Sequence, residues 1–429
     1  MKTYSDSRTR STVRRLGVPR AMLMLSMVAT TACNSLLAVD NPGRVTADAL
    51  SDPALAPILE AAALQSAQCA IAQFAVTGGT LSGEYVVSNG FVDSHPWEWR
   101  GIIEIKGAPG SCPGSRTTTS MGFYTPMQQA RFQLEDLARR LAGFTDAQVP
   151  NRQKMLAEMA AYSGYMHTLL AEGMCDMVLD NGPKMTSAEV WAIAEKRFGD
   201  AITIATTIND VSLLNMARVG RARTRLDLGN LTGAASDAAL VPTGFSRVAE
   251  FSETTPSREN RIYNMTVRND YLSVGPDYRG LTVNGVADPR VKANNMNRVG
   301  ADNVTPMWQQ QKFIGSGAVS LPIASYAEAQ LILAEASGGQ AAVDAINRVR
   351  AITNVAAMAA PAAGTDMVPL VIEERRRQLF SEGQRYVDML RKKIPFVTGV
   401  NRKGQTFSNL TCVPLPDVET RNNPNLKGG

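Results

Sequence analysis

The sequence contains very little histidine: two residues, His95 and His167, in a chain of 429. Histidine supplies many protein zinc ligands and most acid/base relays that work near neutral pH. This scarcity disfavours a His-rich metal site and His-based hydrolase chemistry, and we expect neither a metal nor a cofactor. His167 falls on the apolar side of a helix predicted over about 152–172, where a hydrogen-bonded core histidine is the expected role.

An excess of positive charge is also missing from most of the chain. The formal net charge is +5, but residues 1–32 hold six of the 44 basic residues and one of the 39 acidic ones, which leaves 38 of each. A nucleic-acid footprint needs basic residues concentrated on the folded body. The sequence therefore predicts no nucleic-acid partner.

The N-terminal apolar stretch, residues 21–32, is far shorter than the roughly 20 residues that span a bilayer as a helix. It follows a basic segment and directly precedes Cys33, which is typical of a cleaved signal peptide. Thr30-Thr31-Ala32-Cys33 resembles the lipobox of bacterial lipoproteins, in which the cysteine is acylated. We expect residues 1–32 to be a lipoprotein signal peptide and Cys33 the lipidation site. The alternative is an ordinary secretory peptide followed by an incidental cysteine.

Four cysteines follow Cys33. They are Cys69, Cys112, Cys175 and Cys412. In an oxidising compartment they allow three pairings, and no C-x-x-C spacing points to zinc. The sequence does not choose among the pairings. We favour Cys69 with Cys112, because that bridge would tie the Gly/Pro-rich loop around 107–114 to the first helix.

Helical periodicity dominates the body, and capping boxes at Thr186–Glu189 and Ser325–Glu328 mark two helix starts. A helix is also predicted from Ser51-Asp52-Pro53 to about Val76, another over Val368–Lys392, and a short strand over Arg261–Val267. We expect a mainly α fold with long irregular loop insertions and a few short strands. The expected organisation is a lipidated tether (33–50) and a single domain (51–429) with helical repeats mainly at 125–242, loop-rich regions at 77–124 and 243–320, and C-terminal helices at 325–392.

Three separated stretches together resemble the RagB/SusD family of outer-membrane nutrient-binding lipoproteins. The first, 325–350, has a Tyr-containing helix ending in Ala-Glu-Ala and a second helix with an Asn-x-x-Arg pattern. The second, IEERRRQLFSEGQRYVDMLR at 372–391, resembles the family's most recognisable helix, although Gln378 stands where members usually carry Glu. The third is Val-Pro-Leu-Pro at 413–416 with Asn-Pro-Asn-Leu at 423–426.

The resemblance implies a SusD-like scaffold of tetratricopeptide-like helical repeats on a lipid-anchored protein of the outer membrane, facing outward. It also implies a partner, a SusC-like TonB-dependent transporter, and a ligand, an oligosaccharide or a peptide. Family members are binders, so we expect no enzyme activity.

A saccharide binder needs exposed aromatic rings for stacking and a few orienting polar groups. Aromatics are only 6% of the chain, yet the first loop-rich region, 77–124, concentrates them. From loop placement we predict ligand-binding residues, against the alternative that aromatics beneath long loops pack in satellite clusters. These residues are Tyr85, Trp97, Trp99, Tyr278 and Trp308.

Two other functions remain open from the sequence. A lipid-anchored glycosidase would need two carboxylates about 5–10 Å apart, with Asp93, Glu98 and Glu104 as candidates. A helical-repeat adaptor that assembles envelope proteins would need no small ligand.

Overall fold

The computed structural model describes residues 49–426. The chain divides into two units, Met1–Asp52 and Pro53–Gly429. Of the first unit, the structure describes only residues 49–52, with a 3-10 turn over Ala49–Ser51. The predicted signal peptide and the lipidation site Cys33 lie outside the described residues. Everything below concerns the second unit.

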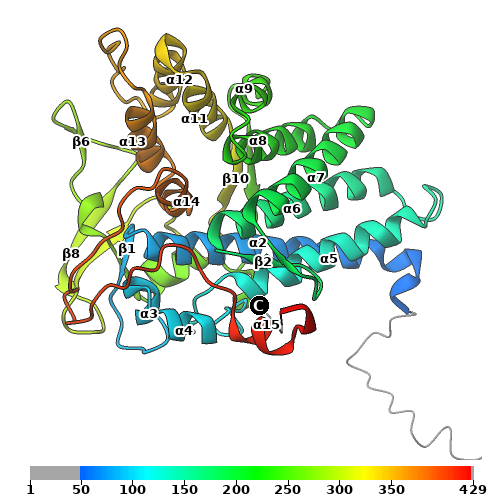
Figure 1. Cartoon of the computed structure of the whole chain (residues 1–429), viewed down its shortest axis with the longest axis horizontal. Coiled ribbons are helices and arrows are strands. Elements are labelled where there is room, and N and C mark those ends of the chain that lie inside the picture. Colours follow the sequence, from blue (N-terminus) through cyan, green and yellow to red (C-terminus); the bar gives the residue numbers. More distant parts are fainter. Residues whose placement is uncertain (1–48, 427–429) are drawn as a thin grey trace, which may run out of the picture. The chain divides into compact units, whose positions relative to one another are not determined.

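Most of the second unit is helical, as the periodicity predicted. Helix α7 begins with the predicted capping box, in which the Thr186 hydroxyl accepts from the Glu189 amide and the Glu189 side chain from the Thr186 amide. Ser325 caps α11 in the same position. The helices of the repeat region are α5 (Tyr124–Ala142), α6 (Arg152–Gly173), α7 (Ser187–Thr207), α8 (Val211–Asp227) and α9 (Leu231–Ala239). Figure 1 shows α5 to α8 side by side, each running back along its predecessor. The mainly α prediction is confirmed.

The first long helix, α2 (Ala56–Leu81), runs further than predicted, through Gly78-Gly79. The missing side chain of Gly79 makes room for the Tyr85 ring, whereas Gly78 has space for a Cβ. A Cβ on Gly79 would lie 2.9 Å from the Tyr85 ring, and one on Gly78 would lie 3.4 Å from Tyr386. By length and composition α2 with its leading turn would also suffice to cross a membrane. Its second half is buried in the protein core, which is the ordinary place of such a helix in a globular domain.

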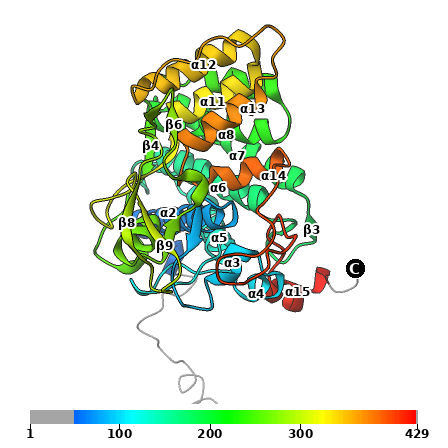
Figure 2. The ribbon, with the colours of Figure 1, turned by 90° about the vertical axis from the view of Figure 1, so that its left-hand side faces the viewer.

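The predicted C-terminal helix over Val368–Lys392 is two helices, α13 (Val368–Gln378) and α14 (Gln384–Arg391). Ser381 and Gly383 between them adopt left-handed backbone conformations, with φ of 66° and 79°, which end one helix and start the next. The other helices of this part are α11 (Tyr326–Ser337), α12 (Gly339–Ile352) and α15 (Asp417–Asn422). Figure 2 shows α11 to α14 grouped together, with α15 near the end of the chain.

The two loop-rich regions contain short elements that the sequence did not predict. The first holds two short helices, α3 (His95–Trp99) and α4 (Ile102–Gly107). In the second, the strand predicted over Arg261–Val267 is wrong: this segment is helical, as α10 (Arg261–Tyr263) and a π turn over Asn264–Arg268. The Asn260 side chain accepts hydrogen bonds from the amides of Ile262 and Tyr263, and this cap starts the helix.

The strands of the described residues form antiparallel pairs. They are β1 (Tyr85–Val87) with β5 (Leu272–Val274), β2 (Met177–Val178) with β3 (Lys184–Met185), β4 (Ser246–Ala249) with β10 (Leu321–Ser325), β6 (Thr282–Val283) with β7 (Val286–Ala287), and β8 (Ala293–Val299) with β9 (Pro306–Gln310). The β1–β5 pair joins the two loop-rich regions, which are nearly two hundred residues apart in the chain.

Two disulfides fasten loops to helices. Cys69 of α2 is bonded to Cys112, the pairing favoured from the sequence, with a Cα–Cα distance of 6.0 Å. Cys175, just after α6, is bonded to Cys412, with a Cα–Cα distance of 5.0 Å. The second bond fixes the far end of residues 393–411, an irregular segment after α14 that we call the C-terminal strap.

Candidate functional site

Three segments far apart in the sequence meet at one face of the protein: the stretch after β1 with α3, the β8–β9 turn, and the C-terminal strap (Figures 1 and 2). We call this surface the loop face. The strap reaches it through a hairpin closed by a bridge between Val400 and Thr406. The side chain of Asn401 accepts hydrogen bonds from the amides of Lys403 and Gln405, which shapes the hairpin turn.

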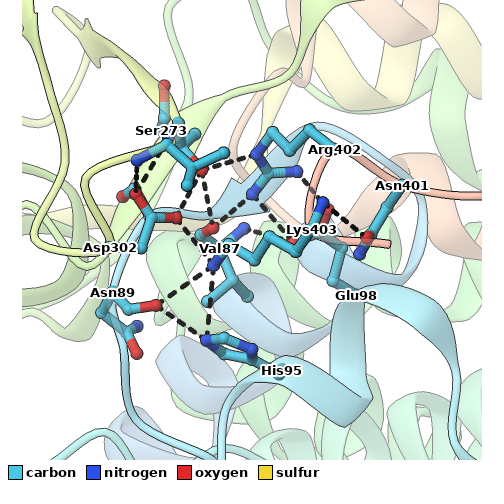
Figure 3. A network of polar contacts seen from close by, with 12 residues as sticks. Val87, Asn89, His95, Glu98, Ser273, Asp302, Asn401, Arg402 and Lys403 are labelled. Atoms are coloured by element: carbon cyan, nitrogen blue, oxygen red, sulfur yellow. Dashed lines mark hydrogen bonds and ion pairs between the residues drawn. The ribbon is translucent and has the colours of Figure 1, made fainter. Parts of the chain in front are cut away.

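An ion pair between Glu98 and Arg402 anchors the tip of the strap (Figure 3). The Glu98 side chain is 4% exposed, and its carboxylate also accepts a 2.7 Å hydrogen bond from the Val87 amide. Arg402 donates in addition to the Val87 carbonyl and, over 2.5 Å, to the Thr305 hydroxyl. One guanidinium thereby joins the strap, β1, α3 and the β8–β9 turn.

Lys403 makes the second anchor (Figure 3). Its ammonium lies 2.7 Å from the Asp302 carboxylate and donates to the Asn89 carbonyl over 3.1 Å. Burial acts to raise the pKa of Asp302, but the hydrogen bonds from Lys403 and Thr305 and from backbone amides outweigh it and lower the pKa to about 2. Burial also lowers the pKa of Lys403, against the attraction of Asp302. The His95 ring nitrogen Nε2 lies 2.7 Å from the same Asn89 carbonyl.

Asn89 holds an exposed aromatic pair next to these anchors. Its side-chain oxygen accepts from the amide of Phe91, and its side-chain nitrogen donates to the carbonyl of Tyr271. The rings of Phe91 and Tyr271 meet edge to face, with centroids 5.5 Å apart. Phe91 is 49% exposed, and Tyr271 is partly exposed. The arrangement presents a fixed apolar platform beside polar and charged groups, which suits stacking against a sugar ring.

A cavity of about 320 Å³ is lined by both Glu98 and Arg402. Arg100 lines it from the end of α3. Arg100 is 2% exposed and has no ion pair among the described residues, but its guanidinium donates to the carbonyls of Val397 and Ser408 and lies between the rings of Phe396 and Phe407. Burial lowers the pKa of Arg100. Its contacts hold the strap against α3.

Three of the five aromatic residues predicted as ligand contacts are buried. Tyr85, Trp97 and Tyr278 are at most 2% exposed, and Tyr85 also lines the 320 Å³ cavity. Ligand contact by these three residues stays a prediction. The Tyr85 hydroxyl lies 2.5 Å from the Ser381 hydroxyl, and the Tyr278 ring stacks on Phe380.

The other two predicted residues are partly exposed at the loop face. Trp308 lies in β9, with the guanidinium of Arg279 5.4 Å from its ring centre. Trp99 ends α3, where its carbonyl accepts from the Ser408 amide of the strap. The structure does not test ligand contact, so both residues stay predictions.

The sequence analysis missed the Phe91–Tyr271 pair. Phe91 lies in the aromatic-rich region 77–124, but the larger tryptophans nearby were preferred. Tyr271 lies in the second loop-rich region, and its approach to Phe91 depends on the β1–β5 pairing, for which the sequence carries no local signal.

The three carboxylates considered for glycosidase chemistry lie in different settings. Glu98 is fully engaged by Arg402 and Val87, as described above. Asp93 accepts from the Thr119 hydroxyl at 2.7 and 2.8 Å, and Glu104 is exposed on α4. Within residues 49–426, no cluster of three or more His, Cys, Asp or Glu side chains offers a metal site.

Comparison with known proteins finds similar sequences and similar folds. Residues 227–427 match a family model described as the SusD family. A solved laminarin binding SusD-like protein aligns with a TM-score of 0.61 and 15% identity, over 84% of this chain and 96% of that one. A SusD superfamily protein from Bacteroides vulgatus ATCC 8482 aligns with a TM-score of 0.64 and 14% identity, over 86% and 96%.

Surface glycan-binding protein A from Bacteroides uniformis is similar in the same way, with a TM-score of 0.59 and 14% identity, over 85% of this chain and 98% of that one. No curated protein matches the chain. At these identities the similarity concerns the fold, and it confirms the SusD-like helical scaffold.

Proposed function

The chain belongs to the RagB/SusD family, and from that premise we propose that its loop face binds an oligosaccharide and does not transform it. The observation that carries the proposal is the exposed Phe91–Tyr271 pair held by Asn89. Two of the similar structures come from proteins described as a laminarin binding SusD-like protein and a surface glycan-binding protein, which supports a glycan as the ligand class.

The proposal includes that the protein does not hydrolyse the bound glycan. A retaining or inverting glycosidase needs one carboxyl group free to give a proton and a second free to attack or to activate water. The carboxylate of Glu98 is held by the Arg402 guanidinium and the Val87 amide, which leaves it poorly suited to either role.

We further propose that the protein works as a surface lipoprotein of the outer membrane. A lipid on Cys33 would hold it there, and it would pass its ligand to a SusC-like TonB-dependent transporter. Residues 34–50 would then serve as the tether between the acylated cysteine and the folded body.

The test is a titration of the purified body, residues 34–429, with neutral oligosaccharides and with peptides of similar length, followed by chromatography of each mixture. The proposal expects heat of binding for at least one glycan and an unchanged glycan after prolonged incubation. Cleaved glycan, or binding of peptides alone, would contradict it.

A further inference from the structure

A second, polar cavity of about 420 Å³ lies next to the one beside Glu98. The two cavities share Asp277 and Val397 as lining residues, so they adjoin along the turn 276–278 and the strap. The second cavity is bounded by α13 and α14, which contribute Arg376 and Arg385. Its volume is sufficient for a monosaccharide unit.

Tyr278 lines this cavity, and its hydroxyl is buried. The residue is 2% exposed, and its ring contacts Phe380 and the guanidinium of Arg376. Its hydroxyl forms no hydrogen bond of normal geometry among the described residues, and the Arg376 guanidinium is the nearby donor that acts on it. Buried polar groups are nearly always hydrogen-bonded, because leaving one unpaired is costly. A buried phenol that lines a cavity and lacks a hydrogen bond of normal geometry is therefore a site for a ligand atom or a water molecule.

Arg385 lines the same cavity and is unlike its neighbours. The other arginines of α13 and α14 are all paired: Arg375 with Asp388, Arg376 and Arg377 with Glu373, and Arg391 with Glu335. Arg385 is partly buried, and within residues 49–426 it has neither an ion pair nor a hydrogen bond. Its guanidinium therefore has free donors beside the buried phenol of Tyr278.

Neither acidic side chain that lines the cavity, Asp277 or Glu373, forms an ion pair with Arg385. The Glu373 carboxylate already accepts from both Arg376 and Arg377. Asp277 is exposed at the rim. Glu84 is buried behind the cavity, where burial raises the pKa of its carboxyl to about 7 although Arg385 and Lys312 act to lower it, so at neutral pH it is only partly charged.

We propose that this cavity binds a carboxylate of the ligand, with the Arg385 guanidinium and the Tyr278 hydroxyl as hydrogen-bond donors. A planar guanidinium and a carboxylate form strong charge-assisted hydrogen bonds. Together with the proposed glycan function, on which it rests, this geometry selects a uronic acid unit. The same chemistry is also present at the C-terminus of a peptide.

The experiment titrates the body, residues 34–429, with glucuronate, glucose and N-acetylalanine, and follows binding by ligand-observed NMR. Arg385→Gln removes the charge, and Tyr278→Phe removes the hydroxyl while keeping the ring that packs on Phe380. Arg421→Gln is the control, because that side chain is 77% exposed on α15. A neutral oligosaccharide that the body binds is titrated against the same variants.

The expected result is glucuronate bound at least tenfold more tightly than glucose, with about a tenfold loss for Arg385→Gln, a smaller loss for Tyr278→Phe and none for Arg421→Gln. Binding of N-acetylalanine as well would assign recognition to the carboxylate alone, while its failure to bind would assign it to the uronic acid. Both outcomes support the site.

Equal affinities for glucuronate and glucose, or a preference for glucuronate that survives Arg385→Gln, would overturn the proposal. A neutral oligosaccharide bound equally by all variants would then leave the proposed function of the loop face intact. Preferential binding of glucuronate without binding of any neutral glycan would instead support the carboxylate site and contradict the proposed function.

Discussion

The helical repeats and the loop face differ in what pairs with the amide and carbonyl groups of the backbone. In α5 to α9 the backbone groups bond to each other, so buried side chains are free to pack, as Phe198 does between α6 and α8. At the loop face the backbone is irregular, and polar side chains complete its hydrogen bonds: Asn89, Arg100 and Arg402 all bond to main-chain atoms. Polar residues there are thus part of the structure, and the exposed aromatic pair is what remains for a ligand.

The largest effect should come from the helical repeats. Phe198 is fully buried, and Cβ atoms added at Gly164 or Gly220 would collide with its ring. We expect Phe198→Ala to lower the free energy of unfolding by about 3–5 kcal/mol, because the two glycines cannot fill the space. Chemical denaturation measures this loss.

If the two regions are separate in function, the same variant keeps its affinity for glycan wherever it remains folded. A Phe198→Ala protein that stays folded but no longer binds glycan would contradict the functional separation of the helical repeats from the loop face.

The second effect is a pH dependence seated in the helical repeats. Burial is the main cause that lowers the pKa of His167 from 6.5 to about 4, with Glu135 acting to raise it. Between these values the unfolded chain binds a proton that the folded chain does not bind, so stability should fall as the pH drops from 6.5 to 4.

The loss attributable to His167 is about 3 kcal/mol at most. In His167→Asn the amide can still donate to the Ser163 carbonyl, which the ring nitrogen now meets at 2.8 Å. Chemical denaturation of the original protein and of His167→Asn at pH 7 and pH 4 gives the contribution of His167 to the pH dependence of stability. An equal pH dependence in the two proteins would contradict the assignment of this effect to His167.

The third effect belongs to the loop face. Arg402→Ala leaves the Glu98 carboxylate buried without its cation and frees the tip of the strap. We expect a loss of about 2 kcal/mol in stability, together with weaker glycan binding because the β1 and β8–β9 segments lose their common anchor.

The control is Arg139→Ala in α5, whose side chain is 70% exposed and pairs with Asp136. An exposed pair of this kind contributes less than about 1 kcal/mol. Similar losses for the two arginines would show that the strap anchor matters no more than a surface pair.

The sequence predicted the elements whose signals are local. Helix α6 was predicted at 152–172 and is found at Arg152–Gly173, and the Thr186 capping box is present as predicted. The sequence did not predict the end of α2, because a Gly-Gly pair usually ends a helix, whereas here Gly78 and Gly79 are buried within it and the Tyr85 ring packs against Gly79.

The candidate site depended still more on distant contacts. The sequence predicted loops around the aromatics, but Tyr85 lies in β1, Trp99 in α3 and Trp308 in β9. Whether a ring is exposed is decided by partners far along the chain. The Tyr85 hydroxyl meets Ser381, and Tyr278 stacks on Phe380. Phe91 is 49% exposed, with its backbone amide held by Asn89 and its ring edge to face with that of Tyr271.

The most direct test of ligand binding at the loop face compares one exposed phenylalanine there with one in the helical repeats. It should also cause the smallest change in stability. Phe91 at the loop face is 49% exposed, and Phe132 on α5 is 57% exposed. Either one changed to alanine should alter stability by no more than about 0.5 kcal/mol. We predict that Phe91→Ala weakens binding of a neutral oligosaccharide about tenfold while Phe132→Ala leaves it unchanged. Equal affinities for the two variants, or a loss confined to Phe132→Ala, would contradict the assignment of ligand binding to the loop face.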